Sequence, residues 1–424
     1  MQTAPRPWRL WQKIIFRFTF LLLGSSTYFC WVMMFYFADS ASPRLEFNPT
    51  SPFKMLVGPF FWLDRHIFHT GYDPKIHDAF PQDDHFGVVF YLSLVLLAII
   101  GTLTWSLLDK KRQQYDRLLF WFRLYIRYIL AMIMFGYGVF KFIPVQMTYP
   151  NIVDLLTPLG EQTKFTILGN FMGVAPGYMM LTGLSEIAAS LLLLNRRSLV
   201  LGYLVQLGVL INVVAFNLLY NVTVKMFSTQ LLIYDLFLIS PYCYRLFQLF
   251  FGGQAVALTE PGYTFLSRGK KYGLAGVLAG MPFLLFCLET AGASRIYKQE
   301  QANVHRQKLY EVTSFIAKDT LPPLLTDTLR WKRFAFAFTN YAVIFDMKDK
   351  KDLYECDADS SKQTFTLHDG KDTLHWPVFH YTYPTGDQLQ LSGKWKGRDI
   401  KVSLRSIPID SMVVNKEKAK WVLD

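Results

Sequence analysis

Stretches of about twenty apolar residues, separated by short polar segments, recur through the first two thirds of this chain of 424 residues. An apolar α-helix of roughly 20 residues spans the roughly 30 Å hydrocarbon core of a bilayer. Seven transmembrane helices are predicted, at residues 14–37, 87–108, 118–147, 177–194, 199–219, 228–246 and 272–291. The fold class is therefore predicted to be an α-helical polytopic membrane bundle.

The last third of the chain has a different pattern. Beyond a polar helical stretch, short runs of alternating apolar and polar residues are separated by turns rich in Lys, Asp and Gly. Alternation of this kind, at a spacing of roughly 8–12 residues, is typical of antiparallel β-sheet. We expect residues 292–424 to form a helix followed by an extracytoplasmic antiparallel β domain, built as a meander, sandwich or small barrel.

The apolar blocks and polar gaps predict four parts. Residues 1–117 hold two N-terminal transmembrane helices with a long outer loop at 39–86, and residues 118–250 hold four helices. Residues 251–291 comprise a cytoplasmic loop and the seventh helix, and residues 292–424 are the β-rich part. Between the third and fourth spans, an apolar stretch broken by Pro158, Gly160 and Pro176 predicts a short surface or re-entrant helix.

The net charge of +12 lies largely in short segments between the apolar blocks, as orientation signals do, so a nucleic-acid partner is not predicted. Lys and Arg are denser in the segments on the side of the amino terminus. This predicts a multi-pass protein of the bacterial inner membrane, with the amino terminus in the cytoplasm and the β domain in the periplasm. The first span is longer than a signal-peptide core and is predicted to stay uncleaved.

Several familiar chemistries have no support in the sequence. The four cysteines include no CxxC pair, so a thioredoxin-like dithiol is not expected. No histidine lies inside a predicted span, which argues against a membrane haem site. The chain also lacks the common nucleotide-binding and zinc-protease motifs. Whether the protein is an enzyme therefore stays open.

Polar residues inside the predicted spans give the main candidate site. A charge at the centre of a membrane helix costs roughly 2.5–3.5 kcal/mol even on the mildest insertion scale, so such groups usually face the protein interior and pair. Independent placement of the spans puts five polar side chains at similar depth: Lys141, Glu186, Asn212, Asn217 and Asp235. They predict an outward-facing polar pocket, or alternatively interhelical ties that only hold the bundle together.

A second, weaker candidate is a metal site in the outer loop. Four histidines cluster there among aspartates: His66, His69, His77 and His85. Imidazole and carboxylate ligands suit zinc or copper, and His66 and His69 have the spacing of one helical turn. The spacing matches no closed zinc motif, so ordinary loop histidines are the alternative.

The four central spans resemble the DoxX-like membrane proteins over roughly residues 118–250. The resemblance begins with Arg127, Gly136-Tyr-Gly138 and Lys141, and continues with Tyr178, Gly183-Leu-Ser-Glu186, a leucine run and Arg196-Arg197. It extends through Asn212, Asn217, Lys225, Ser228 and Leu231-Leu232, and ends at Pro241 and Tyr244-Arg245-Leu246. The family resemblance implies a polar core at Lys141, Glu186 and Asn212.

Relatives in that family include membrane subunits associated with quinol oxidase or thiosulfate:quinone oxidoreductase. Together with the residues described above, this leaves three classes of function open. In the first, the chain is a non-autonomous membrane subunit of a redox or quinone-linked envelope assembly, with a quinone near Lys141 and Glu186. In the second, it is a structural scaffold or assembly factor that binds a membrane or periplasmic partner through its β domain. In the third, it transports a small anion or lipid.

Overall fold

The chain folds into two compact units. The computed structural model describes residues 7–39, 58–71, 83–253, 268–338, 340–368 and 376–416. The membrane unit comprises Met1–Gln146 and Gly177–Tyr297, and the barrel unit comprises Met147–Pro176 and Lys298–Asp424. Most of the predicted outer loop, including His77, lies outside the described residues.

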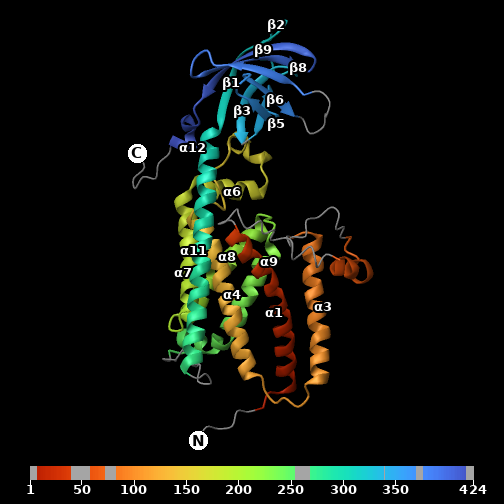
Figure 1. The fold of residues 1–424 in the computed structure, drawn as a ribbon, viewed down its shortest axis with the longest axis vertical. Coiled ribbons are helices and arrows are strands. Elements are labelled where there is room, and N and C mark those ends of the chain that lie inside the picture. The colour runs from red at the N-terminus through yellow and green to blue at the C-terminus, as the bar shows by residue number, and fades with distance from the viewer. Residues whose placement is uncertain are drawn as a thin grey trace. The chain divides into compact units, whose positions relative to one another are not determined.

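The membrane unit is helical (Figure 1). Its longer helices are α1 (Leu10–Asp39), α3 (His85–Leu108), α4 (Asp116–Phe142), α7 (Pro176–Leu194), α8 (Leu199–Leu219), α9 (Lys225–Ile239), α10 (Cys243–Phe251) and α11 (Arg268–Arg306). Within the described residues, six are long and apolar enough to cross a membrane: α1, α3, α4, α7, α8 and α11. The prediction of an α-helical bundle with several helices able to span a membrane is confirmed, with six such helices among the described residues in place of the predicted seven.

The predicted sixth span needs correction. Residues 228–246 do not form one long helix, because α9 has only 15 residues and ends at Ile239. A 3-10 turn at Ser240–Tyr242 follows, and α10 begins at Cys243. Pro241 lies in this turn, and a proline has no backbone N–H with which to continue the helical hydrogen bonds.

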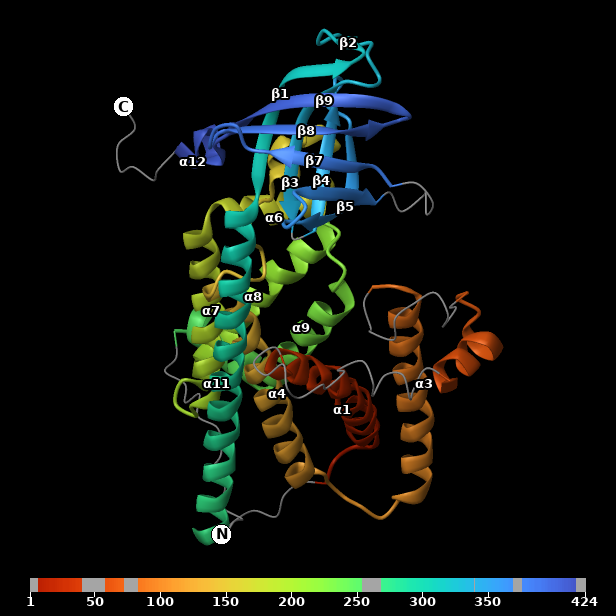
Figure 2. The ribbon, with the colours of Figure 1, turned by 45° about the horizontal axis from the view of Figure 1, so that its top comes forward.

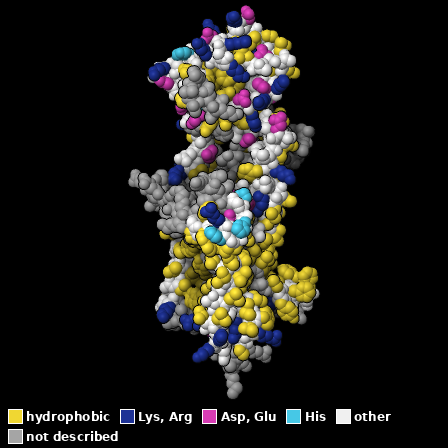
Figure 3. Space-filling model, turned by 90° about the vertical axis from the view of Figure 1, so that its right-hand side faces the viewer, with side chains coloured by type: hydrophobic (Ala, Val, Ile, Leu, Met, Phe, Trp, Pro, Cys, Tyr) yellow, Lys and Arg dark blue, Asp and Glu magenta, His cyan; other side chains and the backbone are white. Residues whose placement is uncertain are grey.

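The outer surface of α3 is suited to lipid. Large apolar side chains are exposed along it, namely Leu92, Val95, Leu97, Ile99, Ile100, Leu103, Leu107 and Leu108. Figure 3 shows hydrophobic side chains gathered over the helical unit on this face, with Lys and Arg concentrated at one of its ends. A continuous apolar surface of this size marks a membrane or protein contact.

The barrel unit is an antiparallel up-and-down sheet (Figure 2). Its strands are β1 (Lys308–Ala317), β2 (Asp319–Thr320), β3 (Trp331–Phe338), β4 (Tyr341–Asp346), β5 (Lys351–Asp359), β6 (Thr364–His368), β7 (Val378–Thr382), β8 (Gln388–Trp395) and β9 (Arg398–Ile407). From β3 to β9 each strand pairs with the next, and β1 pairs with both β3 and β9. The ladder from Leu309–Ile407 to Ile316–Lys401 therefore closes an eight-stranded barrel, with β2 added to β1. The predicted antiparallel β domain is confirmed.

Aromatic side chains fill the barrel interior. The Trp331 ring lies 5.2 Å from the Trp395 ring and 5.7 Å from the Phe379 ring, measured between centroids. Phe365 stacks on Phe379 at 5.5 Å and lies 5.9 Å from Phe334. A barrel of eight strands has an interior just wide enough for side chains to fill it. The sequence alternation that predicted strands thus supplies the core of this unit.

Short helices lie between α4 and α7, where the sequence predicts a short helix. Their membership of the barrel unit was not predicted. The broken stretch forms α5 (Ile152–Leu156), a 3-10 turn and α6 (Lys164–Val174). Ile152 is buried in an apolar cluster with Leu309, Val343 and Phe345, on β1 and β4. Its N–H also donates to Gln307 Oε1 at 3.0 Å. This segment therefore packs on the wall of the barrel.

Candidate functional site

Lys141 and Glu186 form an ion pair between α4 and α7. Lys141 lies in the last turn of α4, and Glu186 lies near the middle of α7. The Lys141 ammonium donates to Glu186 Oε1. The Glu186 side chain is 2% exposed and that of Lys141 is 14% exposed, so the pair is buried but can be approached from the lysine. Two predicted site residues are thus brought together.

Two glycines allow this pair to form. Gly138 precedes Lys141 by three residues, and Gly183 precedes Glu186 by the same interval. A Cβ at Gly183 would lie 2.5 Å from the Phe142 nitrogen and 2.6 Å from the Gly138 carbonyl oxygen. A Cβ at Gly138 would lie 2.8 Å from the Gly183 carbonyl oxygen. The helices therefore meet backbone to backbone, as small residues permit in membranes, and the charged groups one turn later face each other.

The Glu186 carboxylate keeps one oxygen open. Oε1 accepts from Lys141, whereas Oε2 is buried with no hydrogen-bond partner among the described residues. The helix around Glu186 is held by an additional bond, because Ser190 Oγ donates to the Glu186 carbonyl oxygen at 2.8 Å. A buried acceptor without a partner is costly, so it is a good position for a ligand donor or an ordered water. The pair can thus hold a proton or accept a hydroxyl group.

The other three predicted residues lie differently. Asn212 is exposed on α8. It lies two residues from the buried Leu210, so the two side chains point to nearly opposite faces of the helix, roughly 200° apart. Asn217 is buried on α8, and Asp235 is completely buried on α9. Among the described residues, no hydrogen bond or ion pair joins any of these three to Lys141 or Glu186.

A separate polar network ties α1, α3 and α9 together. Gln230 Nε2 donates to Tyr234 Oη at 2.9 Å and to the Ser26 carbonyl oxygen at 3.1 Å. Tyr91 Oη donates to Gln230 Oε1 at 2.7 Å. Tyr234 Oη and Ser26 Oγ share a bond of 2.7 Å. These buried groups satisfy one another, so this network matches the alternative of interhelical ties.

Two buried polar residues are not among the predicted site residues. Both carboxylate oxygens of Glu289, on α11, are buried without a hydrogen-bond partner in the described part of the chain. Gln206, on α8, has the same property at its amide. Glu289 is also an acid inside a predicted span, so the cost of placing a charge in a membrane helix, which points to Glu186, points to Glu289 as well. It lies near the end of that span, where an acid is readily taken for a surface residue.

The described aspartates of the outer loop accept hydrogen bonds from backbone N–H groups, at the starts of two helices and in a turn. Asp84 caps α3 by accepting from the Gly87 N–H at 2.8 Å. Asp83 accepts from the Lys225 and Met226 N–H groups at 2.5 and 2.9 Å and so caps α9. Asp64 accepts from the Thr70 N–H at 2.8 Å. Side chains used in this way have fewer oxygens left for a metal.

The predicted histidine ligands have no common centre in the described residues. His66 Nδ1 lies 2.9 Å from the Trp62 carbonyl oxygen, and its ring stacks on Trp62 at 4.8 Å. His69 has a left-handed backbone at the end of a π-helical turn, and His85 begins α3. No group of three or more metal-binding side chains occurs within the described ranges. Because His77 lies outside them, the metal site stays a prediction.

We expect Asp83→Ala to lower the free energy of unfolding by about 1 kcal/mol, within the range of roughly 0.5–2 kcal/mol for loss of a helix cap. The reason is that α9 would lose the acceptor for two backbone N–H groups. Unfolding by denaturing detergent, followed by circular dichroism, measures the change. Asp410→Ala, at an exposed aspartate, is the control. Equal effects of the two substitutions would contradict the capping role.

Comparisons with protein-family models, with curated proteins and with solved structures find no match for this chain.

Proposed function

We propose that this protein is a DoxX-like membrane subunit of a redox or quinone-linked envelope assembly in the bacterial inner membrane. It is non-autonomous, because its four cysteines are free thiols without a CxxC pair, so electrons pass through a partner protein. The observation that carries the proposal is the ion pair of Lys141 and Glu186, with Oε2 of the carboxylate open.

The pair has the chemistry that a quinone needs. The Lys141 ammonium can donate to a quinone carbonyl oxygen, and Glu186 Oε2 can accept from a quinol hydroxyl group. When a quinol is oxidised, its two electrons go to the redox centre of the partner protein, and its two protons leave one after the other through Glu186. Intramembrane acids are commonly used as proton relays of this kind.

Contacts inside the barrel unit support a topology in which the two ends of the helical bundle lie on opposite sides of the membrane. Because α5 packs on the barrel, the segment 147–176 and residues 298–424 share one side of the membrane. An even number of crossings must therefore separate them. The long helices α7, α8 and α11 supply three, so α9 supplies the fourth. With the turn at 240–242, α9 reaches roughly 28 Å at ordinary helix rises, close to the hydrocarbon thickness.

This topology gives seven crossings and agrees with the charge distribution. Basic residues are denser in the segments on the side of the amino terminus, which places that terminus in the cytoplasm. The barrel unit is then periplasmic.

A second candidate is a scaffold or assembly factor, and the filled barrel interior favours it. Aromatic rings occupy the inside of the barrel, so the outer wall is the surface on which this unit would bind a periplasmic partner. The two functions are compatible, since the chain passes between the units three times, at 146–147, 176–177 and 297–298. Two of these passages flank the helices that carry Lys141 and Glu186.

Quinone binding by the purified full-length protein tests the proposal. We expect native protein to retain quinone on extraction, and added quinone at 100 times its dissociation constant to stabilise the fold by about 2.7 kcal/mol. Glu186→Gln should abolish this gain, and the control Glu161→Gln, at an exposed residue, should keep it. Absence of retained quinone together with unchanged thermal stability on adding quinone would refute the quinone site.

A further inference from the structure

The last long helix of the membrane unit, α11, packs loosely on the rest of that unit. In its most apolar stretch 11% of the residues are buried, whereas the share in the other five candidate spans of the described chain is 33–61%. From Leu274 to Ile296, the buried residues are Pro282, Glu289, Gly292 and Ala293. One of the few residues that hold this helix in place is therefore an acid.

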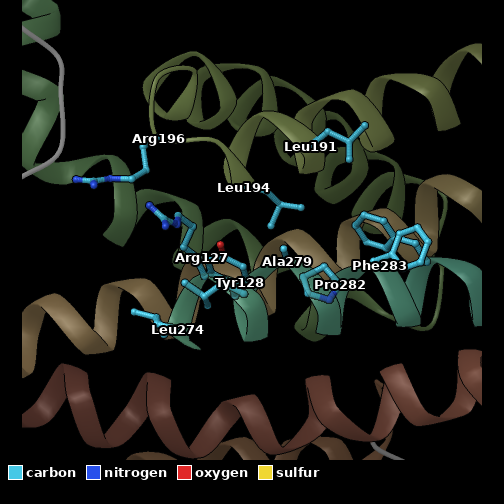
Figure 4. A pocket seen from close by; sticks show the side chains of 12 residues that line it. Arg127, Tyr128, Leu191, Leu194, Arg196, Leu274, Ala279, Pro282 and Phe283 are labelled. Atoms are coloured by element: carbon cyan, nitrogen blue, oxygen red, sulfur yellow. The ribbon is translucent and has the colours of Figure 1, made fainter. Parts of the chain in front are cut away.

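Unfilled space lies beside the N-terminal half of α11. A cavity of about 560 Å³ is bounded by α4, α7 and α11, and Figure 4 shows Tyr128, Leu194 and Pro282 around it, one from each helix. A second cavity, of about 220 Å³, is lined by α1, α4 and the same part of α11. Pro282 lines both cavities, and as a proline inside a helix it cannot donate the usual helical hydrogen bond. Sparse contacts and a missing hydrogen bond both make local opening of α11 easier.

Glu289 lies on the face of α11 that packs on the bundle. It follows Pro282 by seven residues, so the two side chains are roughly 20° apart around the helix. The Phe286 ring stacks on Phe135 of α4, with 3.3 Å between the centroids. The helices α4 and α11 run in the same direction (Figure 1), and Glu289 follows Phe286 by three residues as Gly138 follows Phe135. Glu289 therefore lies near the level of Gly138, at the contact of α11 with α4.

The Glu289 carboxyl group has no partner. Both of its oxygens lack a hydrogen bond among the described residues, and the residue is 0% exposed. The charged residues of α4 and α7 near this level are Lys141 and Glu186, which pair with each other. Tyr137, also near this level, lies against a phenylalanine of α9, with 6.3 Å between the ring centroids. On α11 itself, Arg295 is six residues further on and roughly 240° around the helix.

A buried acid without a donor or a counter-ion keeps its proton. An isolated carboxylate in apolar surroundings is far less favourable than the neutral acid, which can be buried at moderate cost. Stability alone does not account for this residue, because an apolar side chain at position 289 would pack on the bundle with no polar group to bury. Acids in membrane helices are usually functional for this reason.

We propose that Glu289 is a proton-binding site that controls how α11 packs on the membrane unit. With the proton bound, the neutral side chain stays buried and α11 is docked on α4 and α7. When the proton is released to water, the carboxylate becomes hydrated, and α11 opens beside the two cavities, with Pro282 as the point of bending. The site is separate from the ion pair of Lys141 and Glu186 and does not depend on a quinone.

The pH dependence of stability tests this site in the full-length protein in detergent. The folded protein holds one proton more than the unfolded chain, so a rise in pH favours unfolding. Relative to Glu289→Gln, the wild-type unfolding constant should rise by up to about tenfold per pH unit across the neutral to alkaline range, the limit for one proton. Glu289→Leu should resemble Glu289→Gln. Glu161→Gln, at an exposed acid, is the control and should follow the wild type.

Two further measurements identify the proton and the helix. The infrared difference between wild type and Glu289→Gln at neutral pH should contain the C=O band of a protonated carboxyl group. Hydrogen exchange in α11, taken as the ratio of wild type to Glu289→Gln, should rise with pH, while the ratio in α3 stays near one. An equal pH dependence of stability in wild type and Glu289→Gln, or a missing infrared band, would overturn the proton site. Equal exchange ratios in α11 and α3 would overturn its control of α11.

Discussion

Replacing Lys141 by methionine is expected to destabilise the membrane unit by about 3–5 kcal/mol, the usual cost of removing one partner from a buried ion pair. Glu186 is 2% exposed, and its second carboxylate oxygen already lacks a hydrogen-bond partner among the described residues. Without the ammonium group, the carboxylate would be left buried with neither a counter-ion nor a donor. Methionine matches the lysine side chain as far as the ε position and lacks the ammonium group, so the change reports mainly the charge. Denaturing-detergent titration measures the loss.

The matched control is Lys164→Met. Lys164 begins α6 and is exposed, so the same chemical change should alter stability by less than about 0.5 kcal/mol, as is usual for surface substitutions. A loss below about 1 kcal/mol for Lys141→Met would mean that Glu186 finds another partner. The ion pair would then contribute little to the stability of the helical bundle.

Replacing Gly183 by alanine is expected to destabilise the same unit by about 1–3 kcal/mol, the usual cost of adding a methyl group to a well-packed core. The added Cβ would lie 2.5 Å from the Phe142 nitrogen and 2.6 Å from the Gly138 carbonyl oxygen. Because both neighbours are backbone atoms, α4 and α7 must move apart. The ion pair one turn later is then strained as well.

Gly208→Ala is the control for this prediction. Gly208 lies in α8, and a Cβ there would have no atom within 4 Å. Alanine is the better helix former by roughly 1 kcal/mol, so this variant should be as stable as the wild type or more stable. If Gly183→Ala also proves neutral, the helices are not in backbone contact at this point.

The helical part of the fold was largely predictable, because length and hydropathy alone identify membrane helices. The exception was the span at 228–246. Its composition is apolar throughout, but Pro241 ends the regular helix, and hydropathy does not register a missing hydrogen-bond donor. The position of α5 on the barrel wall was not predictable either. That contact joins Ile152 to strands more than 150 residues later in the chain, and the hydrogen bond from Ile152 to Gln307 has the same long range.

The candidate site was predictable only in part. Depth in the membrane correctly placed Lys141 and Glu186 in one polar cluster, and the two charges are paired in the structure. Depth does not specify which way a side chain faces, so it grouped the exposed Asn212 with buried residues. In the sequence, the glycines at 138 and 183 are recognisable only as parts of a family pattern. Their role in the close helix contact became visible only when the two backbones were seen together.

The central claim is that Lys141 and Glu186 act as one buried unit, and a double-mutant cycle tests it most directly. Stabilities of the wild type, Lys141→Met, Glu186→Gln and the double variant are measured by the same detergent titration. We predict a coupling energy above about 1 kcal/mol, with the double variant more stable than the sum of the single losses implies. Losses that add to within about 0.3–0.5 kcal/mol would show that the two residues are independent and contradict the claim.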